Sequence, residues 1–188
     1  IVPLTVSQRT LRDRVVQRVA DALNADGFYE SITLSFVDEK LSTLFTPRQT
    51  PTILSVDHST RRLENVLRQS LVPSLLVARR ENERHNNFNV SLFEIAAVFL
   101  TPNPGEPNSE PRVISFVTGQ SFAEVKGILQ TIASRVNPTN KITARPSDVK
   151  QFVEGRGAEV FLNDKFWGWF GELDRQYTDQ LDLRDVCV

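Results

Sequence analysis

Residues that could bind a metal ion or attack a substrate are scarce in this sequence. The chain has two histidines, His58 and His85, and one cysteine, Cys187. A metal site needs converging histidine, cysteine or carboxylate ligands, and neither histidine has such a ligand at a useful spacing. We therefore interpret both histidines as surface residues and Cys187, with no base near it in sequence, as a small buried residue. The sequence also lacks the phosphate-binding loops GxxxxGK[ST] and GxGxxG.

Charged residues are unevenly distributed, although the formal net charge is only −1. Six arginines and three glutamates fall within residues 61–84, whereas four basic and eight acidic residues follow from position 154 onward. The two segments could contact phosphate groups and a basic partner, but solvated helix faces and turns are the commoner explanation, which we favour. Trp167 and Trp169 could form an aromatic contact surface, although on an alternating strand they more often divide between core and exterior.

The composition is that of a globular protein. Of the 188 residues, 40% are apolar, and twelve phenylalanines are enough for a real core, which excludes wholesale disorder. A single cysteine excludes a disulfide framework, and the neutral total does not indicate a polybasic nucleic-acid binder. No apolar run approaches the roughly 20 residues of a membrane helix, so we expect a soluble, cytoplasmic protein without a membrane partner.

The start and end of the chain suggest a module cut from a longer protein. The chain begins at Ile1 and contains no methionine. It ends in Asp185–Val188, which reads like the start of a strand. We therefore expect residues 1–188 to form a single module.

Hydrophobic periodicity predicts the elements that would position these residues. Helices are expected from residue 11 to Gly27, over 63–71, onward from Pro73, and over 122–136, where Ser121 and Glu124 form a capping box. Strands are expected over 32–36, 90–99, 113–117, 142–144, 158–162 and 166–170, with Asn163-Asp164 as a hairpin turn. The proline-rich residues 101–111 should form an exposed loop. This pattern favours an α+β fold with helices packed on a largely antiparallel sheet.

Three stretches of the chain, taken together, resemble one protein family. They are residues 24–33 (Asn-Ala-Asp-Gly-Phe-Tyr-Glu-Ser-Ile-Thr), residues 67–76 followed by 92–99, and residues 155–158 followed by 168–173. The expected helix over 122–136, with Lys126-Gly127, fits between the second and third stretches. In order and spacing they are similar to the beta subunit of bacterial phenylalanyl-tRNA synthetase, over nearly the whole chain.

The resemblance implies a module with the class II aminoacyl-tRNA synthetase core, an antiparallel sheet flanked by helices, that is not itself catalytic. In a working class II core the corresponding strand ends in Phe-Arg-x-Glu, whose Arg holds the α-phosphate and whose Glu helps place ATP. Here Leu100 and Pro102 replace the two charged residues. Leucine cannot make a charge-assisted phosphate contact. The resemblance therefore implies no cofactor for this chain, with ATP and Mg²⁺ used by the complete enzyme.

The implied partner is the catalytic alpha subunit, in an alpha2beta2 enzyme that charges tRNA(Phe). Our leading hypothesis is a structural module that packs on and orients this subunit through its N-terminal helix and the strand that follows. The interface candidates are Arg12, Val15, Val16, Val19, Leu23, Phe28, Ile32, Leu34 and Phe36.

Two alternatives remain open. An active nucleotide-binding, class II-like ligase would need another arginine in place of the missing one, such as Arg79, Arg80 or Arg156. A tRNA-contacting module would use Arg79, Arg80 and Arg84.

Overall fold

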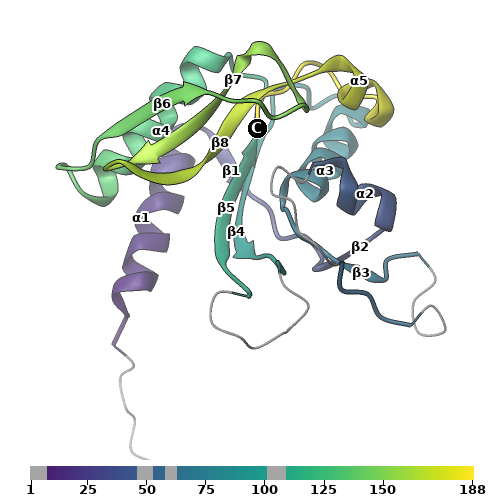
Figure 1. The fold of residues 1–188 in the computed structure, drawn as a ribbon, viewed down its shortest axis with the longest axis horizontal. Coiled ribbons are helices and arrows are strands. Elements are labelled where there is room, and N and C mark those ends of the chain that lie inside the picture. The colour runs from purple at the N-terminus through teal and green to yellow at the C-terminus, as the bar shows by residue number, and fades with distance from the viewer. Residues whose placement is uncertain (1–7, 46–52, 58–62, 101–108) are drawn as a thin grey trace, which may run out of the picture.

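Two three-stranded sheets, joined by the last residues of the chain, form the centre of the fold (Figure 1). The structure, a computed structural model, describes residues 8–45, 53–57, 63–100 and 109–188. In the first sheet, β1 (Phe28–Glu30) pairs in parallel with β4 (Ser91–Ala97), which pairs antiparallel with β5 (Arg112–Val117). The second sheet is antiparallel and contains β6 (Ile142–Pro146), β7 (Phe152–Leu162) and β8 (Lys165–Leu173). The strands β2 (Phe36–Val37) and β3 (Val66–Leu67) form a separate short pair.

Residues 186–188, which we call the joining segment, lie between β5 and β8. Cys187 exchanges two backbone hydrogen bonds of 2.8 and 3.0 Å with Thr118, directly after β5. On the other side, Val188 exchanges two hydrogen bonds of 2.9 Å with Gly171 of β8. The strand-like pairing expected at the end of the chain is thus confirmed. The joining segment turns the two sheets into one continuous sheet with the order β1, β4, β5, joining segment, β8, β7 and β6.

The long helices α1 (Leu11–Ala25) and α4 (Phe122–Val136) pack on each other and against one face of the sheet. Both begin with a reciprocal capping box, Thr10 with Asp13 in α1 and Ser121 with Glu124 in α4. The hydrogen bonds from Thr10 and Ser121 lower the pKa values of the Asp13 and Glu124 carboxyl groups. The helix predicted over 122–136 is therefore confirmed, including its first turn.

The opposite face of the sheet is covered by α3 (Val72–Arg84), with the short elements α2 (Glu39–Leu44), α5 (Arg175–Thr178) and the 3₁₀ turn η1 (Asp179–Leu181) near it (Figure 1). Side chains of one strand alternate between the two faces. Phe93 of β4 belongs to the core beneath α1 and α4, and its neighbour Leu92 to the core beneath α3. A sheet covered on both faces explains why 92–99 reads as a nearly continuous apolar run.

Several expected elements are confirmed and two are wrong. The helices at the N-terminus and after Pro73, and the strands β4, β5, β6, β7 and β8, lie where the sequence predicts them, and Asn163 and Asp164 form the hairpin turn with positive φ. The strand expected over 32–36 is not one: the paired residues are 28–30 and 36–37. The helix expected over 63–71 is also absent, because residues 66–67 pair with β2 and Arg68 is drawn into a buried ion pair.

The expected loop over 101–111 falls mostly outside the described residues, since only 109–111 are described. Within the described ranges, no helix combines the length and the apolar composition needed to cross a bilayer.

Two facing glycines allow the hairpin of β7 and β8 to close over the ring of Phe152. Gly157 and Gly171 are paired across the two strands. A Cβ atom on either would lie 2.5 or 2.6 Å from the nearest atom of the Phe152 ring, closer than real Cβ contacts allow. By contrast, a Cβ atom on Gly168 of the same strand would meet nothing within 4 Å. Phe152 therefore explains the glycine at position 171, but not the one at 168.

We predict that Gly171→Ala lowers the free energy of unfolding by about 1–3 kcal/mol, because the added methyl group overpacks the site against Phe152. The matched variant Gly168→Ala should change it by less than about 0.5 kcal/mol or stabilise the strand. Urea unfolding followed by circular dichroism measures both. Equal effects of the two substitutions would contradict the role given to Phe152.

Candidate functional site

The segment that follows β1 exposes large apolar side chains. Ile32 is 92% exposed and Leu34 is 63% exposed, and Tyr29 on β1 is 66% exposed. The intervening Thr33 is half-buried and points to the protein interior. The alternation that suggested a half-buried strand is real, but its orientation is the reverse of that in a core strand. An exposed alternating apolar pair of this kind is typical of a surface that another protein covers.

A buried ion pair holds this segment in place. Arg68 and Glu94, with side chains 5% and 4% exposed, lie 3.0 Å apart. The Glu94 carboxylate also accepts hydrogen bonds from the Thr33 hydroxyl at 2.7 Å and the Thr33 backbone N–H at 3.3 Å. Arg68 donates to the Thr33 carbonyl and, through Nε, to the Ala97 carbonyl, both at 3.2 Å. The hydroxyl, N–H and carbonyl of Thr33 all bond to the buried pair. In an extended segment, its neighbours Ile32 and Leu34 must therefore point to solvent.

The interface candidates from the sequence fall into three groups. Leu23 and Phe28 are buried in the chain's own core. Val15, Val16, Val19 and Phe36 are half-buried, and Val19 packs against that core. Arg12, Ile32 and Leu34 are exposed. A partner could therefore reach the third group fully and the second in part, whereas Leu23 and Phe28 have no exposed surface to offer.

Arg79 is buried, so its position does not fit a surface contact with tRNA. The whole residue is only 2% exposed. Its guanidinium donates hydrogen bonds to the Glu83 carboxylate at 3.0 Å and to the carbonyls of Phe88 and Val90. Glu83 also accepts from the backbone N–H of Arg184, so this cluster ties α3 to the chain just before the joining segment. The positive charge of Arg79, which the sequence suggested as a surface contact, is therefore buried.

The other arginines named by the sequence lie nearer the surface. Arg80 and Arg84 both pair with Glu81, at 3.4 and 2.9 Å. Arg156 holds both carboxylate oxygens of Glu172, at 2.7 and 2.8 Å, which raises the pKa of the Arg156 guanidinium. Arg80 and Arg84 thus share one carboxylate, Arg156 has its own, and none of the three lines the cavity described next.

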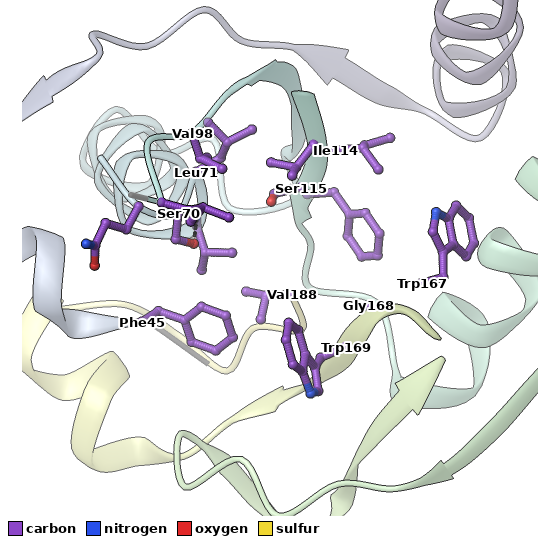
Figure 2. Close-up of a pocket in the computed structure, with 15 residues that line it drawn as sticks. Phe45, Ser70, Leu71, Val98, Ile114, Ser115, Trp167, Gly168, Trp169 and Val188 are labelled. Atoms are coloured by element: carbon purple, nitrogen blue, oxygen red, sulfur yellow. Dashed lines mark hydrogen bonds between the residues drawn. The ribbon is translucent and has the colours of Figure 1, made fainter. Parts of the chain in front are cut away.

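A cavity of about 160 Å³ lies between β5 and β8, beside the end of the joining segment (Figure 2). Figure 2 shows Phe45, Val188 and Trp169 on one side of it and Leu71, Val98 and Ile114 on the other. Leu100, at the position where the resemblance expects an arginine, is also part of the lining. None of its fifteen lining residues has a charged side chain. The cavity therefore does not fit a nucleotide triphosphate or its Mg²⁺ ion, which need cationic and carboxylate partners.

Cys187 is 2% exposed, and burial raises the pKa of its thiol to about 12, so it is not poised to act as a nucleophile. His85 is exposed, with Nδ1 2.7 Å from the Glu81 carbonyl oxygen, and His58 lies outside the described residues. In the part of the chain that the structure describes, histidine, cysteine and carboxylate side chains form no group of three that could hold a metal ion.

Sequence reasoning missed both the buried ion pair and the cavity. A signal for the first was present: Glu94 stands inside the apolar run of β4, where an acidic residue needs a buried partner. The partner, Arg68, was assigned to a helix and to a basic surface. No signal for the cavity existed, because it depends on how β5 and β8 diverge in space.

Comparison with known proteins identifies relatives of this chain. Residues 1–188 match the family model described as phenylalanyl tRNA synthetase beta chain CLM domain. The phenylalanine–tRNA ligase beta subunit of Bacillus subtilis is 30% identical over 187 residues, covering 92% of this chain and 23% of the relative. The beta subunit of Staphylococcus aureus strain Mu50 is 29% identical and covers 98% of this chain and 24% of its own length. The chain thus spans about a quarter of the length of these relatives.

The fold also has solved counterparts. Two structures of pyrrolysyl-tRNA synthetase from Desulfitobacterium hafniense superimpose with TM-scores of 0.69 and 0.70, at 18% and 17% identity. They cover 93% and 96% of this chain, and the chain covers 63% and 65% of theirs. The likeness confirms the expected α+β fold, with an antiparallel sheet flanked by helices as in the class II synthetase core.

We predict that Glu94→Ala lowers the free energy of unfolding by about 3–5 kcal/mol, because it leaves the Arg68 guanidinium buried without its counter-charge. The matched control is Glu81→Ala, which removes a carboxylate that is 48% exposed and should cost less than about 1 kcal/mol. Denaturant unfolding measures both. A small effect of Glu94→Ala would show that the pair does not hold the segment after β1.

Proposed function

Because the chain belongs to the phenylalanyl-tRNA synthetase beta chain CLM domain family, we propose that it is a non-catalytic structural module that packs on and orients a catalytic alpha subunit. The observation that carries the proposal is the exposed pair Ile32 and Leu34, fixed from behind by Arg68 and Glu94. An apolar surface held in one conformation loses little conformational entropy on association, which favours stable binding.

The exposed pair is placed to receive a folded partner. Ile32 and Leu34 follow β1, which lies at the edge of the sheet beside α1. The exposed side of α1 supplies Arg12, and the half-buried Val15 and Val16 extend the surface along the same helix. In this proposal the exposed pair forms the apolar centre of the interface and α1 contributes its charged margin, the usual arrangement of a subunit interface.

The uncharged cavity supports the non-catalytic part of the proposal. A class II-like ligase domain would need a cation where ATP phosphates bind, and Leu100 lines the cavity instead. The arginines considered as replacements are engaged elsewhere with Glu81, Glu83 or Glu172. In this proposal ATP and Mg²⁺ are used by the alpha subunit, and tRNA(Phe) is a substrate of the complete alpha2beta2 enzyme.

We predict that the double variant Ile32→Asp, Leu34→Asp binds the alpha subunit at least about 100-fold more weakly, since two carboxylates would lose water at the interface without partners. Both side chains are exposed, so the chain itself should stay folded, as circular dichroism can verify. Co-purification and sedimentation with the alpha subunit measure the loss.

The matched control is Leu63→Asp, which changes an apolar side chain that is 74% exposed and lies outside the proposed surface. It should leave association unchanged. Undiminished binding by a folded Ile32→Asp, Leu34→Asp chain would refute this placement of the interface.

We also predict that the chain gives no saturable heat with ATP and Mg²⁺ at millimolar concentration in titration calorimetry, because its cavity offers no charged group to the phosphates. The intact alpha–beta enzyme serves as the positive control. Saturable binding by this chain alone would favour the active-ligase alternative.

A further inference from the structure

Some exposed arginines have no partner within the chain, and most of these lie near the start of α1. The majority of the described arginines bind a carboxylate, a backbone carbonyl or an aromatic ring, as Arg156 does with Glu172 and Arg145 with the ring of Phe161. Within the described ranges, five exposed arginine side chains make no contact of these kinds: Arg9, Arg12, Arg14, Arg112 and Arg135. An exposed guanidinium without an internal partner is available to another molecule.

Two of the five, Arg12 in the first turn of α1 and Arg112 at the start of β5, bring positive charge to the same place. The hydrogen bonds of the capping box with Thr10 lower the pKa of Asp13 most, and the positive charges of Arg112 and Arg12 lower it further. Asp13 forms no ion pair with either arginine, and its Oδ2 accepts from both the N–H and the hydroxyl of Thr10. The two guanidinium groups therefore lie near the start of α1 without a paired acid.

Strand alternation places Arg112 on the face of the sheet that α1 covers. Alternate residues of one strand share a face. Phe116 belongs to the core beneath α1 and α4, and Ile114 packs against that core. Arg112 continues the same series along β5 and is exposed. It therefore lies where this face of the sheet extends beyond the core.

The exposed apolar pair lies on the same face. Phe28 of β1 belongs to the core beneath α1 and α4, and alternation carries this side of the chain to Ile32 and Leu34. The chain turns back between α1 and β1. A helix rises about 1.5 Å and a strand about 3.3 Å per residue, so Leu34 and Arg12 are both about 20 Å from that turn. Leu34 is therefore level with the first turn of α1.

We propose that the partner covering this face presents carboxylates to Arg12 and Arg112, so that ion pairs between the two chains close one end of the apolar surface. This rests on the proposed function, because the partner meant is the catalytic alpha subunit. A guanidinium donates two parallel hydrogen bonds to one carboxylate, which fixes orientation as well as charge.

The neighbours of the two arginines favour an acidic protein surface over the phosphates of RNA. Ile32 and Leu34 are 92% and 63% exposed on the same face, and aliphatic side chains have no complement in a phosphate backbone. A subunit interface, by contrast, combines an apolar centre with a polar rim in which arginine is common.

The first experiment reverses one charge at a time. Arg12→Glu and Arg112→Glu should each slow association with the alpha subunit at least about threefold at low salt, because they remove the attraction between the two surfaces. Added salt should slow the unmodified chain and reduce this difference. Stopped-flow mixing measures the rates.

The matched control is Lys165→Glu, which makes the same change of charge at an exposed residue of β8. Figure 1 shows β6, β7 and β8 at the end of the molecule away from the start of α1. This variant should associate at the unmodified rate.

The second experiment identifies the acidic partner directly. Arg12→Lys and Arg112→Lys keep the positive charge and supply an amine, which a carbodiimide joins to a carboxylate in direct contact. Mass spectrometry of the digested complex should find a link from position 12 or 112 to an aspartate or glutamate of the alpha subunit. Lys165, already present in the chain, should give no such link.

The outcomes separate this proposal from the proposed function. Unchanged association of Arg12→Glu and Arg112→Glu, while Ile32→Asp, Leu34→Asp still weakens binding, would overturn the ion pairs and leave the subunit interface in place. Failure of the unmodified chain to bind the alpha subunit would overturn both. Weaker binding of tRNA with unchanged binding of the alpha subunit would assign the two arginines to phosphate and would also overturn the proposal.

Discussion

Pairing of the joining segment with two strands at once is the constraint on which the whole architecture depends. Cys187 and Val188 bond to Thr118 on one side and to Gly171 on the other. Without these bonds, β1, β4 and β5 would form one small sheet and β6, β7 and β8 another, each with an open edge. The same residues also contribute side chains to both cores. Backbone pairing and core packing therefore stabilise the same few positions.

The buried ion pair of Arg68 and Glu94 determines which side chains are exposed on the segment after β1. The bonds that Arg68 and Glu94 make to Thr33 draw a polar residue inward and leave Ile32 and Leu34 in solvent. Burying two charges costs free energy unless they are well paired, so a pair of this kind is a poor way to gain stability alone. What it does provide is one fixed geometry for an exposed apolar segment. The fixed geometry of this segment therefore accounts both for the free energy spent on burying the ion pair and for the exposure of Ile32 and Leu34.

Much of the fold follows from local sequence signals. The capping box at Ser121, the apolar stripe of α4 and the turn at Asn163-Asp164 act over a few residues, and each was predicted correctly. The errors arise where distant residues decide. Residues 63–71 have helical spacing, but pairing with β2 and the buried partner of Arg68 override it. Residues 32–36 have strand spacing, but no neighbouring strand is available to most of them.

The residue types at the candidate site could be predicted from the sequence, but their arrangement in space could not. Leu100 could be recognised as an unsuitable phosphate ligand from its chemistry alone, and the structure places it on an uncharged cavity. Of the interface candidates, those that are exposed could not be separated by pattern from Leu23 and Phe28, which the chain uses in its own core. Periodicity identifies an apolar face but does not say whether it meets the same chain or another one. That distinction requires the tertiary contacts.

The position of the joining segment in the sequence has a consequence for folding. The strand that completes the middle of the sheet is the last of those described to be synthesised, while its neighbours β5 and β8 are made earlier and far from each other along the chain. During synthesis, the sheet of β1, β4 and β5 and the sheet of β6, β7 and β8 can form separately but cannot be joined until residues 186–188 emerge. Such long-range closure is slow, and until then β5 and β8 each present an unpaired edge. We therefore expect the chain to be most open to misassembly before residues 186–188 have been made.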